Sequence, residues 1–111
     1  MAAPNTIKAD NSLIGEITKR IVDRFHPKRV VLFGSYARGD ARPDSDLDLM
    51  IEMETDLPPA CRIRAIAALF MDRTWPMDLV VFTRQEVRAN RNMRGTLLYS
   101  IEREGKVLYG S

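Results

Sequence analysis

The sequence predicts a single α/β (α+β) domain in which helices flank a small mixed β-sheet. Segments with apolar residues at helical spacing alternate along the chain with short runs of β-branched and aromatic residues. No repeat or linker interrupts the 111 residues, a common length for one domain. We therefore expect one domain over residues 1–111, with residues 1–11 as a flexible N-terminus. The alternation leaves the strand order open.

The first half of the chain predicts one long helix and three short elements. Apolar residues recur every three or four positions over residues 12–25, and Pro27 follows the end of this pattern. The next segments are predicted as a strand at Arg29–Phe33, a helical turn at Ser35–Arg38 and a loop at 39–45.

The second half alternates in the same way. Strands are predicted at 46–53, 77–83 and 106–109, and helices from Pro58 or Pro59 to Arg73, from Arg84 onward and at 96–104. Proline is well suited to the first turn of a helix, and Thr83 can cap the helix that begins at Arg84.

Several functional classes are excluded by what the sequence lacks. Cys61 is the only cysteine, so the chain cannot form an internal disulfide or a cysteine-rich zinc site. His26 is the only histidine, and its place before Pro27 favours a helix-end or surface role. The sequence has neither an apolar run long enough for a membrane span nor a secretory signal, so we expect a cytoplasmic protein.

The charge of the chain is unevenly distributed. Residues 40–56 contain seven acidic residues and one arginine, a net charge of −6, so the rest of the chain must carry +8 to give the total of +2. A concentrated acidic stretch in an otherwise basic chain indicates a site that holds cations.

A Gly34–Ser35 pair follows the predicted strand and opens the helical turn. Glycine allows a ligand to approach the backbone closely, and the start of a helix presents N–H groups to an anion. The Ser35 hydroxyl can donate a further hydrogen bond to a phosphate. Alone, this pair is typical of an ordinary turn.

Asp46 and Asp48 are two residues apart in a predicted strand, so their carboxylates share one face while Leu47 faces the other way. Two carboxylates about 6 Å apart repel by about 2–3 kcal/mol at an effective dielectric of about 20. A bridging cation removes this cost, and oxygen ligands suit Mg²⁺ or Mn²⁺. The alternative is a solvated loop in which water screens both groups.

Asp78 stands at the head of the apolar run 79–82. A carboxylate entering a buried strand needs a partner. A salt bridge to one of the arginines is one answer, and a metal shared with Asp46 and Asp48 on a neighbouring strand is the other.

Together, these pieces resemble the minimal nucleotidyltransferase (MNT) family of the DNA polymerase β superfamily. The family pattern is Gly-Ser, ten residues, Asp-x-Asp on a strand and a later third acid on another strand. This chain has Gly34–Ser35, then Asp46 and Asp48, then Asp78, and the resemblance runs over residues 14–109. It implies a polymerase-β-like nucleotidyltransferase fold.

The resemblance also implies the chemistry of the site. Asp46, Asp48 and Asp78 would be catalytic and would hold two Mg²⁺ ions, or Mn²⁺, against ATP. Gly34 and Ser35 would hold the β- and γ-phosphates, and Arg38 would contact phosphate. Asp78 would lie on the acceptor side and take the acceptor's proton. In-line attack at phosphorus requires positioning and charge neutralisation, which paired metals supply.

The partner implied by the resemblance is a HEPN-type toxin protein, which the chain would adenylylate as its antitoxin. We expect no separate acceptor-recognition domain, no membrane and no direct DNA binding. Two alternatives remain open: an antitoxin that binds its toxin without catalysis, and an enzyme that modifies a small molecule, as in aminoglycoside nucleotidyltransferases.

A row of arginines offers a possible partner surface. Arg84, Arg88, Arg91 and Arg94 are spaced by four, three and three residues, which places them on one face if the segment is helical. Gly95 limits how far that helix can run. A solvated charged face explains the same spacing.

Overall fold

The computed structural model describes residues 11–110 as five α-helices, one 3₁₀ helix and four strands. The elements are α1 (Asn11–Phe25), β1 (Arg29–Phe33), α2 (Ser35–Arg38), β2 (Leu47–Glu52), α3 (Pro59–Ala67), η1 (Ala68–Phe70), β3 (Met77–Phe82), α4 (Arg84–Asn90), α5 (Leu97–Glu104) and β4 (Lys106–Gly110).

The strands form one mixed sheet in the order β3-β2-β1-β4. β1 is antiparallel to both β2 and β4, whereas β2 and β3 are parallel. The predicted fold class is therefore confirmed, and the structure adds the strand order. The parallel pairing of β2 and β3 brings the starts of these two strands to the same edge of the sheet.

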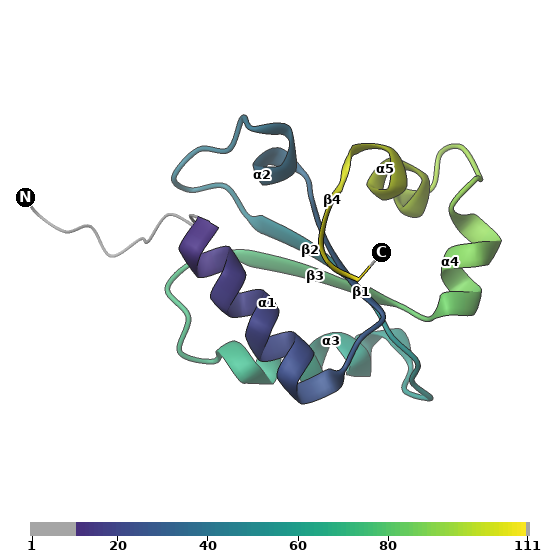
Figure 1. Cartoon of the computed structure of the whole chain (residues 1–111), viewed down its shortest axis with the longest axis horizontal. Coiled ribbons are helices and arrows are strands. Elements are labelled where there is room, and N and C mark those ends of the chain that lie inside the picture. The colour runs from purple at the N-terminus through teal and green to yellow at the C-terminus, as the bar shows by residue number, and fades with distance from the viewer. Residues whose placement is uncertain (1–10, 111) are drawn as a thin grey trace, which may run out of the picture.

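Helices cover both faces of the sheet (Figure 1). The larger core packs α1, α3 and η1 against one face, through residues such as Ile17, Ile21 and Phe70. A smaller core packs α4 and α5 against the other face, through Val87 and Ile101. β2 is central and buried on both faces except near its start, where Asp48 is half-buried.

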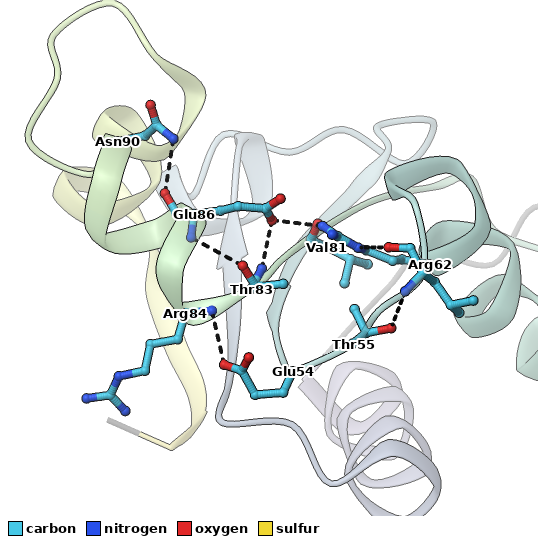
Figure 2. Close-up of polar contacts among 9 residues, drawn as sticks. Glu54, Thr55, Arg62, Val81, Thr83, Arg84, Glu86 and Asn90 are labelled. Atoms are coloured by element: carbon cyan, nitrogen blue, oxygen red, sulfur yellow. Dashed lines mark hydrogen bonds and ion pairs between the residues drawn. The ribbon is translucent and has the colours of Figure 1, made fainter.

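A polar network holds the start of α4 (Figure 2). Thr83 and Glu86 form a capping box, in which each side chain accepts a hydrogen bond from the other residue's backbone N–H. The buried Arg62 guanidinium on α3 donates to Glu86 at 2.8 Å. These bonds satisfy N–H groups that lack partners within the helix, and they confirm Thr83 as the predicted cap.

Several boundaries differ from the prediction, most of them by one residue. The helix expected to reach Arg73 ends at Ala67 and continues as the 3₁₀ turn η1 to Phe70, whose fully buried ring fixes the chain there. Asn11 belongs to α1 and not to a flexible N-terminus, because asparagine is well suited to the start of a helix. Residues 1–10 lie outside the described part of the chain. Asp46 lies directly before β2.

The predicted helix-end or surface position of His26 agrees with the structure. Cys61 is a half-buried free thiol. His26 is exposed and follows the end of α1 with a φ of 50°. None of the helices described over residues 11–110 is long and apolar enough to cross a membrane.

Candidate active site

Gly34 lies between β1 and α2, directly against Asp48. Its φ of 73° falls in the region that favours glycine, and it caps α2 without a side chain. A Cβ atom added at Gly34 would collide with the Oδ2 atom of Asp48. Glycine is therefore required here for two independent reasons, and its absent side chain leaves room for the Asp48 carboxylate.

Asp48 and Asp78 are direct partners in the register of β2 and β3. Neighbouring strands are about 4.8 Å apart, so the two carboxylates leave the backbone side by side. Met50 belongs to the core under α4 and α5, and side chains two apart in a strand share a face, so Asp48 points toward that side. The expectation that Asp78 lies on a strand adjacent to the Asp46–Asp48 segment is confirmed.

Leu47, Leu49 and Ile51 are fully buried in the opposite core, as their alternation with the acids predicts. The Leu47 backbone N–H also donates to the Pro76 carbonyl at 3.0 Å, which ties the start of β2 to the residue before β3. This packing fixes the strand segment from which Asp48 projects.

The electrostatics of the site centre on Asp48. Partial burial, followed by the charges of Asp78 and Asp46, raises the pKa of its carboxyl group from 3.8 to about 6, while Arg38 acts in the opposite direction. The negative charges of Asp78 and Asp46 thus act on Asp48, and the charge of Arg38 offsets them only in part. A divalent cation would provide that compensation.

The donor set fits such a cation in its chemistry. Carboxylate oxygens from adjacent strands are suitable Mg²⁺ ligands, and Gly34 leaves Asp48 accessible. Within residues 11–110, however, no three His, Cys, Asp or Glu side chains are already arranged as a metal-ion site. The predicted metal roles of Asp46, Asp48 and Asp78 therefore stay predictions.

Ser35 and Arg38 occupy the two ends of α2. Ser35 is half-buried and follows Gly34 at the start of the helix, while Arg38 is exposed in its last turn. The Arg38 Nε atom lies 3.4 Å from the Asp40 carboxylate. The charge of Arg38 also acts on Asp48, where it partly offsets the effects that raise the pKa of that carboxyl group. The predicted phosphate-binding residues thus border the predicted acids.

A pocket of about 310 Å³ opens beside Gly34. It is lined by Phe33, Gly34, Arg38, Leu97, Ser100, Ile101 and Glu104. Sequence reasoning did not identify the contribution of α5, because nothing in the local pattern of residues 97–104 indicates that this helix packs beside a turn sixty residues earlier. A larger pocket, of about 410 Å³, lies elsewhere, at the opposite end of β1.

The family to which this arrangement corresponds is found by comparison with known proteins. The model of the family described as "Nucleotidyltransferase domain" matches residues 14–108. The match includes Gly34, Ser35, Asp46, Asp48 and Asp78.

A relative from Thermococcus cleftensis, named protein adenylyltransferase MntA, is 35% identical over 49 residues. The matched stretch covers 44% of this chain and 50% of that relative. The chain thus spans about half the length of this relative.

Solved structures share the fold at low sequence identity. A candidate nucleotidyltransferase from Sulfolobus solfataricus superimposes with a TM-score of 0.62 at 20% identity, over 89% of this chain and 78% of that one. A toxin–antitoxin structure with AMP-PNP gives a TM-score of 0.57 at 21% identity, over 87% of this chain and 73% of that one.

Proposed function

The chain belongs to the nucleotidyltransferase domain family, and from that premise we propose that it transfers AMP from ATP to a partner toxin protein. The observation that carries this proposal is the register of Asp48 beside Asp78, with Gly34 leaving space over the Asp48 carboxylate. This register supports a single ligand site that both acids face at the end of the sheet.

The first task of the site is to hold the triphosphate. Gly34 allows the phosphates to approach the backbone, and the N–H groups at the start of α2 together with the Ser35 hydroxyl donate hydrogen bonds to the β- and γ-phosphates. Arg38, one turn later, adds a positive charge at the rim of the adjoining pocket. These contacts stabilise the pyrophosphate as it leaves.

The second task of the site is to place the carboxylates at the reacting phosphate. Asp46 and Asp48 would hold Mg²⁺ against the triphosphate, and Asp78 would complete the set on the acceptor side. When bound, Mg²⁺ neutralises charge on the phosphates and aligns the attacking and leaving oxygens. An acceptor hydroxyl oxygen bonds to the α-phosphorus, the bond from that phosphorus to the bridging oxygen breaks, and Asp78 takes the hydroxyl proton.

The identity of the acceptor rests on the comparisons. A relative bears the name protein adenylyltransferase, and a neighbour in fold is a toxin–antitoxin structure with AMP-PNP. A HEPN-type toxin as the acceptor is the specific form of our proposal, with the chain acting as its antitoxin.

Transfer of label from α-labelled ATP tests the proposal. The protein is incubated with Mg²⁺, with and without the partner encoded beside it, and label is followed on protein and on small molecules. We expect label on the partner, and Asp48→Asn should reduce its appearance by about 100-fold or more, since it removes a charged ligand from the reaction centre. Asp44→Asn is the matched control, because it removes an exposed acid from the loop that precedes β2.

Each alternative has its own signature in this experiment. Label on a small molecule would replace the protein acceptor by a small-molecule substrate. A tight complex without any transfer would support an antitoxin that acts by contact alone. Equal transfer by Asp48→Asn and the unchanged protein would refute the role of the acids.

A further inference from the structure

A second pocket, larger than the one beside Gly34, lies at the end of β1 farthest from Gly34. We call it the basic pocket. Its lining residues come from the start of β1 and the residue before it, from the end of β2, and from α4 and the residue after it: Lys28, Arg29, Glu52, Arg84, Val87, Arg88 and Arg91. Arg29 and Phe33 are four residues apart in a strand, so about 13 Å separate the pocket from the candidate active site.

At the centre of the basic pocket, the single cation Arg29 is paired with two acids. The Arg29 guanidinium donates to Glu52 at 2.8 Å and, through two nitrogens, to Glu102 on α5 at 3.1 and 2.5 Å. The hydrogen bonds with Glu102 raise the pKa of Arg29 and lower that of Glu102. This part of the pocket is a structural network.

The rim of the pocket is not balanced. Over residues 11–110, no ion pair joins Lys28, Arg84, Arg88 or Arg91 to an acid. Arg91 favours the ionised form of Glu102 from a distance, and the Glu54 carboxylate accepts a 3.4 Å hydrogen bond only from the backbone N–H of Arg84. The Arg84 side chain points away from the Arg62–Glu86 pair (Figure 2). Five cations against Glu52 and Glu102 leave a net charge of +3.

The helix geometry explains why these cations converge. Arg84, Arg88 and Arg91 follow the four- and three-residue spacing of one helix face, as predicted. The predicted fourth member, Arg94, does not line the pocket, because α4 ends at Asn90 and the chain turns through Gly95 (φ 89°). The arginine row is therefore shorter than its sequence spacing indicates. Lys28, which lies directly before β1, adds a further cation to the pocket.

We propose that the basic pocket binds a compact polyphosphate anion, either free or as the phosphate tail of a nucleotide. Guanidinium groups form paired hydrogen bonds with phosphate, and three of them converge here. A volume of about 410 Å³ suits a small ligand. Val87 is the only apolar lining residue, and no aromatic ring is available to stack a base. The pocket thus recognises charge and not the nucleoside, which disfavours single-stranded RNA.

The proposal does not depend on the proposed function and is tested without Mg²⁺. Inorganic tripolyphosphate, ATP and a uridine oligonucleotide are titrated into the protein in EDTA by calorimetry. We expect tripolyphosphate and ATP to bind with one site and similar affinity, and binding to weaken as salt is raised. The double variant Arg88→Gln/Arg91→Gln should weaken both by tenfold or more, since two charge-assisted contacts are lost.

Arg94→Gln is the matched control, because it removes an arginine from the same segment but outside the pocket. Asp48→Asn serves as a second control, since it alters the candidate active site and should leave tripolyphosphate binding unchanged. Binding of tripolyphosphate that survives the double variant, or that falls equally with Arg94→Gln, would overturn the proposal. Binding of ATP or the oligonucleotide but not tripolyphosphate would overturn it as well.

Discussion

Two charged groups at opposite ends of β1 differ in how their charge is compensated: the acids near Gly34, and the network that Arg29 forms with Glu52 and Glu102. At the end near Gly34, partial burial and the charges of Asp78 and Asp46 raise the pKa of Asp48 to about 6. At the other end, Arg29 is held between two glutamates, and its hydrogen bonds with Glu102 raise the pKa of Arg29 and lower that of Glu102. Compensated charge maintains the fold, whereas charge that the protein leaves uncompensated marks a place for a ligand.

The compensated network of Arg29, Glu52 and Glu102 should contribute more to the stability of the fold. Arg29→Met removes the shared cation and leaves the buried Glu52 and the half-buried Glu102 without their partner, which should cost about 3–5 kcal/mol. Denaturant unfolding measures the change. Lys19→Met is the control, because it removes an exposed i,i+4 pair with Asp23 that should contribute nothing measurable. Equal effects of the two variants would remove the distinction between the ends.

The uncompensated end should dominate activity. Gly34→Ala places a Cβ atom against the Asp48 carboxylate and should reduce nucleotide transfer by about 100-fold, or about 2.7 kcal/mol. Gly39→Ala isolates the backbone effect: its φ is also positive, at 86°, but no atom lies within 4 Å of the added Cβ. Comparable losses in both variants would show that backbone strain, and not the position of Asp48, controls transfer.

The raised pKa of Asp48 also predicts a pH dependence. With a pKa of about 6, its carboxylate is mostly ionised at pH 7 and mostly protonated at pH 5. Protons then compete with Mg²⁺, so the affinity for Mg²⁺ with a nonhydrolysable ATP analogue should fall roughly tenfold between these values. Thermal shifts at the two pH values measure the change. The same thermal shift at pH 5 and at pH 7 in the unchanged protein would contradict this prediction.

The smallest expected effect is a gain in stability. The Asp48 pKa is raised in the native state, so that state loses stability as pH rises from about 4 to about 6. Asp48→Asn should therefore stabilise the Mg²⁺-free protein at pH 7.5 by about 1 kcal/mol, allowing for solvent screening at this partly exposed group. The gain should disappear near pH 4. Destabilisation of the variant at pH 7.5 would place Asp48 among the structural charges.

Local patterns predicted much of this molecule, and long-range packing explains the rest. The buried faces of β2 follow from alternation, and the cap at Thr83 follows from its side chain. The strand order does not follow from local patterns. The pairing of Arg29 with Glu102 does not follow from them either, because these residues are 73 positions apart and meet only through the packing of α5 on the sheet.

The same limit applies to both pockets. Gly34 and Ser35 are visible as a motif, but the α5 residues Ser100 and Glu104 join them only in the folded chain. The row of arginines is visible as a spacing in the sequence. The place of Lys28, the residue before β1, in the same pocket is not, and neither is the absence of Arg94 from that pocket after the end of α4. Sequence spacing thus identifies one side of each pocket, and the topology supplies the other side.

β1 is a five-residue strand hydrogen-bonded on both sides, so the span between the two pockets cannot stretch or shorten while the sheet is intact. A single triphosphate is too short to touch both ends at once. Substitutions at the two ends should consequently combine as independent free-energy changes, additive to within about 0.5 kcal/mol. Any larger coupling would mean that one extended molecule lies along the strand and occupies both pockets together.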